Sequence, residues 1–458
     1  LDLRPEYHFT RLANEMNDPN GLMWLPGPPS ASGAPAYSYH MFFQSTDPGQ
    51  SAGSIWGHAM SPDLVRWRRM NRSGVRGSTG GGVALDRESG PARAAIVASV
   101  PIFPPRVPAV GLSVWLSNDE NLTTWSALEN GTCAGTTSPT SGMICPKMVR
   151  DQERTRSTKR AQPSPLSRPT TYNPPHSQVP DELRAGYIGD NYVWKEDAAN
   201  GATTYYVLSG SNVCPTGAAA WCGYAAQNAT PQALLFSSPD LKSWKFVSQF
   251  WAGESPDGGK SLRVDTPETF PLPNGRQAFI WLNDHVGKTY WMVGTLDRTT
   301  MKFTSTAAAM EDGGAFFCGQ SLEGPLGRRV QFGWLKLNGL PGFTGAQSLP
   351  RQIIVDPSDP TGGGLWFRPL PEIWTLHSGA AITHVSPMFR AGTRVDITPL
   401  LALLKRPLQM HLRFIVTIDA TSGATGGGVA IDVLGGAAAK GATLTLTRSG
   451  AVTPSPTP

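Results

Sequence analysis

One short phrase recurs along the chain and restricts the folds that it can adopt. A Ser, an Asp, a Leu and a Trp keep the same order in three segments, Ser61–Trp67, Ser117–Trp125 and Ser238–Trp244, with a weaker echo at Leu296–Phe303. The copies recur about every 50 to 70 residues where no insertion intervenes, a period typical of propeller blades. A polar turn followed by a Trp that covers an outer strand therefore predicts a β-propeller. The alternative is chance recurrence of a common turn.

Short strand-like runs occupy the chain between these copies, and abundant Gly (50) and Pro (41) residues separate them. This pattern predicts an all-β protein with few long helices. A length of 458 residues favours two domains. From about Gly363 the chain alternates apolar and polar residues between Gly-rich turns, as β-sandwiches do. We predict a propeller over residues 1–355 and a β-sandwich over 356–458 that ends in a linker-like tail.

The charge of the chain points to no nucleic acid or membrane partner. The formal net charge is +5, and much of the excess falls in Lys147–Arg168, which has almost no large apolar residues. Such a run predicts a flexible, disordered basic insertion at about 146–186 rather than a nucleic-acid groove. No apolar stretch approaches the ~20 residues that a membrane span requires.

The sequons and cysteines favour a secreted protein, extracellular or vacuolar. The chain begins at Leu1 without Met, as a trimmed product would, and Asn-x-Ser/Thr sequons stand at Asn71, Asn121, Asn130 and Asn228. Short loops separate Cys133 from Cys145 and Cys214 from Cys222, so we expect these two disulfides, with Cys318 left over and buried. The eight His show no ligand spacing, so no metal site is expected.

Asn17-Asp18-Pro19-Asn20-Gly21 is the first segment with candidate chemistry. These residue types are those of a surface turn, which is the simplest interpretation. The apolar run Leu22–Leu25 follows at once, however, so the turn is expected to feed an inner strand. A carboxylate at Asp18 would then point into a funnel rather than out to solvent.

This segment resembles the nucleophile motif of glycoside hydrolase family 32, the invertases, inulinases, levanases and fructan exohydrolases. Further matches follow in the order of the family, and they span most of residues 1–351: Tyr39–Gln44, Ile55–Trp67, Gly327–Trp334 and Gln347–Arg351. The resemblance implies a five-bladed β-propeller followed by a β-sandwich, here shorter than is usual in the family.

The resemblance also implies a retaining hydrolase of terminal β-D-fructofuranosides such as sucrose or fructans, with no cofactor. A nucleophile and a general acid/base then stand about 5 to 5.5 Å apart across the scissile bond. Asp18 matches the nucleophile, and a third carboxylate holds the fructose hydroxyls and stabilises the transition state.

Asp190 matches that third carboxylate, with one departure. The family reads Arg-Asp-Pro where this chain reads Gly189-Asp190-Asn191. A guanidinium is therefore missing, which would cost about 1.5 to 3 kcal/mol unless another donor replaces it.

The acid/base position departs as well. The family reads Glu-Cys-Pro-Asp where this chain reads Asp265-Thr266-Pro267-Glu268, so a shorter side chain stands at the expected Glu. Misplacement by about 1 Å can reduce a rate about a hundredfold. We predict Asp265 as the acid/base, with Glu268 as the alternative, because strand alternation makes it less certain that Glu268 faces the same site.

The remaining candidates bind substrate: Asn17, Gln44, Trp56, Thr79 and Glu268. Trp56 and Trp24 are candidate walls for a sugar ring, with simple core packing as the alternative. The family has an aromatic residue followed by Ser-Gly-Ser where this chain has Ser78–Gly82, so the pocket wall is expected to be thinner. These departures leave two other interpretations open, a fructan- or sucrose-binding relative with impaired catalysis and a fructosyltransferase.

Overall fold

The fold is that of a computed structural model, which describes most of residues 5–377 and three strands beyond them. The gaps are 6, 26–38, 47–54, 76, 78, 86–91, 102–109, 129–178, 219–221, 224–225, 259–260, 313–315 and 338–341, and beyond residue 377 only 428–433, 442–447 and 452–456 are described. The basic stretch Lys147–Arg168, Cys133, Cys145 and Asn130 lie outside the described residues.

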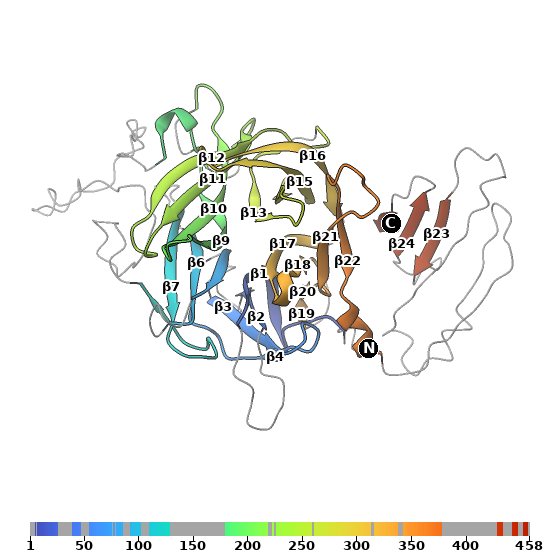
Figure 1. Ribbon diagram of the computed structural model, residues 1–458. Coiled ribbons are helices and arrows are strands. Elements are labelled where there is room, and N and C mark those ends of the chain that lie inside the picture. The colour runs from blue at the N-terminus through green and yellow to red at the C-terminus, as the bar shows by residue number, and fades with distance from the viewer. Residues whose placement is uncertain are drawn as a thin grey trace, which may run out of the picture. The chain divides into compact units, whose positions relative to one another are not determined.

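Five antiparallel sheets of four main strands form the five blades of a β-propeller, which confirms the predicted architecture (Figure 1). Blade 1 contains β1 (Asn14–Trp24), β2 (Tyr39–Thr46), β3 (Ile55–Ser61) and β4 (Arg68–Arg69). Blade 2 contains β5 (Gly80–Ala84), β6 (Ala94–Pro101), β7 (Val110–Ser117) and β8 (Trp125–Ala127). Blade 3 contains β9 (Gly189–Asp197), β10 (Thr203–Val213), β11 (Thr230–Ser238) and β12 (Lys245–Ala252).

Blades 4 and 5 complete the ring. Blade 4 contains β13 (Asp265–Pro271), β14 (Gln277–Asn283), β15 (Lys288–Asp297) and β16 (Lys302–Asp312). Blade 5 contains β17 (Phe316–Glu323), β18 (Arg329–Leu335), β21 (Arg351–Val355) and β22 (Leu365–Pro369), with β20 (Ala346–Gln347) beside β18. β19 (Phe343–Thr344) pairs in parallel with β1, which ties the last blade to the first. The short helices are η2 (Asp181–Leu183), η3 (Pro325–Gly327) and η4 (Pro371–Leu376).

The recurring phrase forms the turn between the third and fourth strands of blades 1, 2 and 3. In each copy the Asp side chain accepts hydrogen bonds from backbone N–H groups of the turn, as Asp240 does from Lys242 and Ser243. The Leu that follows has a positive φ (Leu64 68°, Leu122 55°, Leu241 63°). Its carbonyl accepts the indole N–H of the Trp at 2.9 Å in all three copies. The shared order of residue types is therefore a local hydrogen-bonding unit that closes a blade.

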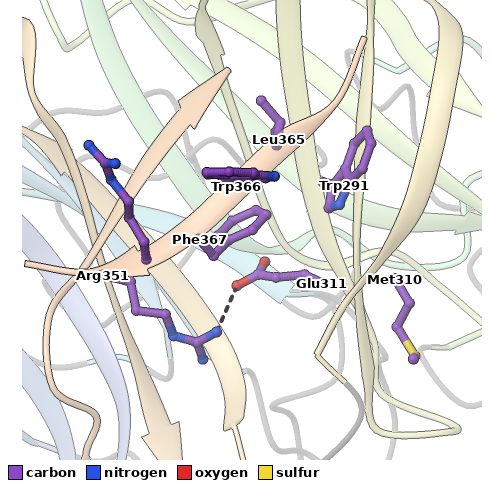
Figure 2. A pocket seen from close by; sticks show the side chains of 8 residues that line it. Trp291, Met310, Glu311, Arg351, Leu365, Trp366 and Phe367 are labelled. Carbon is purple, nitrogen blue, oxygen red and sulfur yellow. Dashed lines mark ion pairs between the residues drawn. The ribbon is translucent and has the colours of Figure 1, made fainter. Parts of the chain in front are cut away.

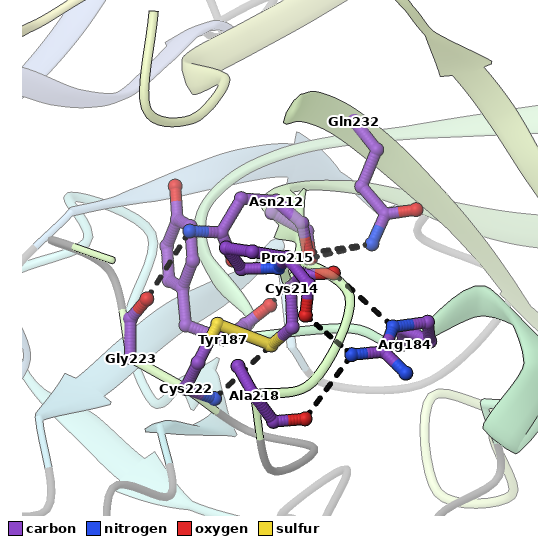
Figure 3. The surroundings of a disulfide bond; sticks show 10 residues. Arg184, Tyr187, Asn212, Cys214, Pro215, Ala218, Cys222, Gly223 and Gln232 are labelled. Carbon is purple, nitrogen blue, oxygen red and sulfur yellow. Dashed lines mark hydrogen bonds between the residues drawn. A yellow bond between two sulfur atoms is a disulfide. The ribbon is translucent and has the colours of Figure 1, made fainter. Parts of the chain in front are cut away.

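The Cys214–Cys222 disulfide is present as predicted, and it closes the loop after β10 (Figure 3). The two Cα atoms lie 5.9 Å apart. Arg184 binds the same loop, since its guanidinium donates to the carbonyls of Cys214, Pro215 and Ala218. Cys318 is buried and unpaired, also as predicted.

Replacing both Cys214 and Cys222 by Ala is expected to lower the free energy of unfolding by about 2.5 kcal/mol, because a short cross-linked loop restricts the unfolded chain. Urea unfolding of the wild type and the double variant measures this difference. The same midpoint for both proteins would contradict the prediction and would mean that Arg184 alone fixes the loop.

The chain divides into two compact units, Leu1–Leu376 and His377–Pro458. The first unit includes β22 because this strand pairs with β21 and completes blade 5. The second unit contains a three-stranded antiparallel sheet of β23 (Gly428–Val433), β24 (Ala442–Thr447) and β25 (Val452–Pro456). The β-sandwich and the domain boundary at 355 remain predictions.

Candidate functional site

Three of the five innermost strands bring the three predicted carboxylates toward the centre of the propeller. Asp18 lies on β1, Asp190 on β9 and Asp265 at the start of β13. The innermost strands β1, β5, β9, β13 and β17 contact one another in a ring (Figure 1). Asp18 is 7% exposed and Asp265 is 6% exposed, so neither faces bulk solvent.

A β-bulge interrupts each of these three strands at or next to its carboxylate. The pairing register shifts between Met16 and Pro19 on β1, at Asp190 on β9, and between Asp265 and Glu268 on β13. Asp190 has a φ of 49° and Thr266 a φ of 39°. Bulges redirect side chains, and non-Gly residues with positive φ are uncommon and often functional. The bulges therefore aim the acids inward where regular strand alternation would not.

Asp18 is held by two neighbouring strands. The Gln44 side-chain amide on β2 donates to Asp18 Oδ2 at 2.9 Å, and the Cys318 thiol on β17 hydrogen-bonds the same carboxyl group. Burial, opposed by the hydrogen bond from Cys318 and aided by the charge of Asp265, raises the pKa of Asp18 to about 7. No role was predicted for Cys318, because its contact with Asp18 joins residues 300 positions apart.

Asp190 and Asp265 form a hydrogen-bonded carboxyl pair across blades 3 and 4. The Thr79 hydroxyl donates to Asp190 Oδ1, and the Ser99 hydroxyl oxygen accepts the Asp190 backbone N–H at 2.7 Å. Burial and the adjacent Asp265 raise the pKa of Asp190 well above its usual range. Two carboxyl groups in contact can hold one proton between them, as in other acid dyads. The pair can therefore both store and deliver a proton.

Arg263 faces this pair and is a site residue that the sequence did not single out. Its Nη2 atom donates to Asp265 Oδ2 at 3.1 Å and also to Asp284, which follows β14. Its side chain is 13% exposed. Because successive same-face residues of an extended chain are two apart, the spacing from Asp265 was a usable signal.

Glu268 contacts blade 5. Its carboxylate accepts hydrogen bonds from the backbone N–H and the hydroxyl of Ser321. Burial raises the pKa of Glu268 to about 7, against the opposing effects of Ser321, Arg329 and Gln331, which all lie on β17 or β18. Its Oε1 atom has no hydrogen-bond partner among the described residues.

The other residues predicted to bind substrate, Asn17, Gln44, Trp56 and Thr79, differ in their contacts with the carboxylates. Gln44 contacts Asp18 and Thr79 contacts Asp190, whereas Gln347 binds the backbone carbonyl of Asn17. Trp56 is fully buried, and its indole N–H donates to the carbonyl of Gly77. The packing alternative thus accounts for Trp56, and its role in substrate binding stays a prediction.

The Gly80–Gly82 run allows β5 to pass close to its neighbours. A Cβ on Gly80 would lie 2.3 Å from the carbonyl oxygen of Val97, and one on Gly81 would lie 2.6 Å from the backbone nitrogen of Val193. This close approach gives a structural reason for the departure from the family pattern at Ser78–Gly82. Ser78 itself lies outside the described residues.

A cavity of about 310 Å³ lies between the outer strands of blades 4 and 5, and none of the three carboxylates lines it (Figure 2). Trp291, Trp366 and Glu311 line it, and Arg351 Nη1 lies 3.8 Å from Glu311 Oε1. The Glu311 side chain is fully buried, and burial raises its pKa to about 8 against the opposing charge of Arg351.

This shift predicts a loss of stability as the pH rises. A carboxyl group whose pKa is raised on folding stabilises the protein below its unfolded pKa, and this contribution is lost as the pH rises from 4.5 to about 8. We expect the loss to be on the order of a few kcal/mol and to be absent in Glu311→Gln. Urea unfolding at pH 5 and pH 8, which together span most of this window, measures how the free energy of unfolding changes with pH. Glu323→Gln, which changes an exposed carboxylate on the neighbouring blade 5, is the control, and equal slopes in wild type and Glu311→Gln would refute the prediction.

Among the described residues, no group of three or more His, Cys, Asp or Glu side chains is placed to hold a metal ion. Within the same part of the chain, no helix has the length and apolar character to cross a membrane. Asn71, Asn121 and Asn228 are exposed, as glycan acceptors must be.

Comparison with known proteins relates this propeller to one family. The model of the glycosyl hydrolases family 32 N-terminal domain matches residues 8–73 and 215–369, which include Asp18, Asp265 and Glu268 but not Asp190. A levanase of Bacillus subtilis is 44% identical over 70 residues, 15% of this chain and 9% of that protein. Beta-fructofuranosidase 1 of Zea mays is 23% identical over 448 residues, 92% of this chain and 57% of that protein.

Solved structures share the fold. A mutant of a GH32 β-fructofuranosidase of Bombyx mori, in complex with sucrose, has a TM-score of 0.57 and 20% identity over 82% of this chain and 68% of that chain. Fructan 1-exohydrolase IIa of Cichorium intybus has a TM-score of 0.55 and 19% identity over 82% of this chain and 62% of that chain. The chain thus spans only part of these relatives. The family model and the shared five-bladed fold together relate the chain to glycosyl hydrolase family 32.

Proposed function

We propose that this protein is a retaining glycoside hydrolase that releases terminal β-D-fructofuranosyl units from sucrose or fructans. Asp18 is the nucleophile, Asp265 the general acid/base and Asp190 the stabiliser of the transition state. The observation that carries the proposal is that Asp265 interacts with both other carboxyl groups, although the three come from three blades. Burying several carboxyl groups side by side costs free energy, and such clusters are typical of functional sites.

The proposed reaction proceeds by double displacement. In the first step an Asp18 oxygen attacks the anomeric carbon of the fructosyl unit, the bond from that carbon to the leaving oxygen breaks, and Asp265 gives its proton to that oxygen. In the second step Asp265 removes a proton from water, whose oxygen attacks the same carbon and displaces Asp18. Asp18 must be ionised at the start, and its hydrogen bond from Gln44 favours that state.

The third carboxyl group acts through contact rather than proton transfer to the sugar. In the proposed mechanism Asp190 binds fructose hydroxyls and faces the positive charge that develops on the ring. Burial and the hydrogen bond with Asp265 raise the pKa of Asp190, so Asp190 can hold a proton next to the acid/base before cleavage. Thr79 fixes Asp190 from blade 2, which supports its predicted place near the substrate.

A second interpretation, a fructan- or sucrose-binding relative with impaired catalysis, has one observation in its favour. Arg263 Nη2 donates to Asp265 Oδ2, so one oxygen of the short acid/base side chain is already engaged before a substrate binds. A fructosyltransferase differs only in the acceptor of the second step. Product analysis distinguishes all three.

The test is to incubate the purified protein with sucrose, inulin and levan and to quantify the products over time. A hydrolase releases free fructose, and NMR of the first product shows the β-anomer if configuration is retained. A transferase yields longer fructosides, with less free fructose than glucose from sucrose. A binding relative releases nothing but gives saturable heat on titration with fructan. Absence of both turnover and binding would refute the proposal.

We also propose that the protein is secreted and glycosylated, with a β-sandwich after the propeller. The exposed sequons at Asn71, Asn121 and Asn228 and the Cys214–Cys222 disulfide support secretion. Extracellular exo-inulinases of Aspergillus are among the relatives. Expression in a secreting eukaryotic host tests this, because endoglycosidase treatment should then reduce the mass of the protein in the medium.

A further inference from the structure

Arg263 lies among more carboxylates than one ion pair would require. It donates hydrogen bonds to Asp265 and Asp284, and its charge also lowers the pKa of Asp190 against the larger effect of burial. Burial alone would lower the pKa of Arg263, but these carboxylates raise it above its usual range. The guanidinium is therefore the positive partner of a carboxylate cluster that spans two blades.

The backbone holds Arg263 at the boundary between blades 3 and 4. The next residue, Val264, is fully buried and donates its N–H to the carbonyl of Ser211 on β10 at 3.0 Å. Its own carbonyl accepts the Tyr187 hydroxyl. Gly210 makes this approach possible, since a Cβ there would lie 2.4 Å from the Val264 oxygen. The segment that leads into blade 4 is thus bound to blade 3, and it carries the guanidinium to the side of Asp190.

Position 189 offers the complementary observation. Gly189 precedes Asp190 and has no side chain with which to balance its charge. Position 189 therefore supplies no cation, and Arg263 reaches the pair from the segment that leads into blade 4.

We propose that Arg263 is a positioning residue that orients Asp265 and balances the charge of the Asp190–Asp265 pair from blade 4. This inference rests on the proposed function, whose acid/base is Asp265. Arg263 binds one Asp265 oxygen, Oδ2, which fixes the short side chain in a single orientation. The positive charge lowers the pKa of Asp190 against the larger effect of burial. In the second step it keeps the carboxylate in place for water.

The test compares Arg263→Ala, Arg263→Lys and the control Arg298→Ala, which removes an exposed ion pair with Glu196 that joins the same two blades. We expect Arg263→Ala to lower kcat/KM on sucrose about 10- to 100-fold, the loss typical of a charge-assisted contact. Millimolar guanidinium should restore part of the activity of Arg263→Ala and none in Arg298→Ala. Arg263→Lys should keep most of the positive charge next to the carboxyl pair but hold Asp265 less firmly in one orientation.

The pH profile supplies a measurement that a merely structural role would not change. Without Arg263, Asp190 releases its proton less readily, so the alkaline limb of kcat/KM should move to higher pH in Arg263→Ala and remain in place in Arg298→Ala. Urea unfolding of each variant shows that the fold is retained. An active wild type with an unshifted limb and no guanidinium rescue in Arg263→Ala would overturn the inference and leave the proposed function standing.

An inactive wild type would instead count against the proposed function, and the inference is then decided without turnover. NMR titration of Asp carboxyl carbons should show Asp190 titrating at higher pH in Arg263→Ala than in wild type. An identical titration in both proteins would overturn the inference.

Discussion

Replacing Asp18 by Asn is expected to abolish fructose release from sucrose, lowering kcat by about 10⁴-fold or more, as loss of a nucleophile does in other enzymes. The amide has nearly the same shape, so the substitution removes the nucleophilic oxygen charge and little else. Gln44 donates to Asp18 Oδ2 and the Cys318 thiol contacts the same group, so an amide oxygen can still accept either bond. The measurement is initial-rate release of glucose and fructose, with fructose binding by calorimetry in parallel.

The matched control is Asp240→Asn, the same chemical change in the turn of blade 3. Asp240 caps the backbone N–H groups of Lys242 and Ser243, and Asn caps turns of this kind as well. We expect near wild-type rates from this variant. Activity in Asp18→Asn that exceeds a trace, in protein free of wild-type contamination, would remove Asp18 as the nucleophile and with it the proposed double displacement.

Local chemistry made the propeller predictable from the sequence. The Asp, Leu and Trp of each phrase form their hydrogen bonds within a single turn. Residues that are close in the sequence are therefore also close in the structure, and a sequence pattern can reveal the contact. The weaker echo at Leu296–Phe303 forms a similar turn, since Asp297 accepts the backbone N–H of Thr299 and Met301 has a φ of 53°. Phe303 stands in the place of the Trp, and its side chain has no N–H with which to complete the hydrogen-bonding unit. The fifth blade lacks the phrase, and its strands were expected only through the resemblance.

The site was less predictable because its contacts cross blades. Asp18, Asp190 and Asp265 were expected from motifs, yet Arg263, Cys318 and Asp284 join them only through folding. The bulges also escape a simple periodic pattern. Strand alternation places residues three apart on opposite faces, but the extra residue at Thr266 sets Asp265 opposite Leu282 and Glu268 opposite Ile280, two positions apart on β14. The two acids therefore share a face of β13. They differ in their position along the strand, not in the face from which they project.

That separation underlies the second large prediction, which concerns the acid/base. Asp265→Ala is expected to lower kcat on sucrose by about 10² to 10⁴-fold, the contribution of a general acid. The loss should be smaller on a fructoside whose leaving group is a nitrophenol, because that group departs without protonation. Azide should restore turnover in Asp265→Ala and yield β-fructosyl azide, since an anion that needs no deprotonation can replace water in the second step.

Glu268 provides the matched test because it is a buried carboxylate on the same strand and face. Its oxygen accepts two hydrogen bonds from Ser321, so Glu268→Gln preserves much of the packing that Glu268→Ala would remove. We expect Glu268→Gln to retain most of its turnover and to form no azide product, although burial that raises its pKa to about 7 would suit a general acid. A general acid must first lie within hydrogen-bonding distance of the leaving oxygen, whatever its pKa. We therefore give more weight to the contact of Glu268 with Ser321 than to its raised pKa. Azide rescue in a Glu268 variant, with none in Asp265→Ala, would reverse the assignment and make the Asp190–Asp265 pair a binding element.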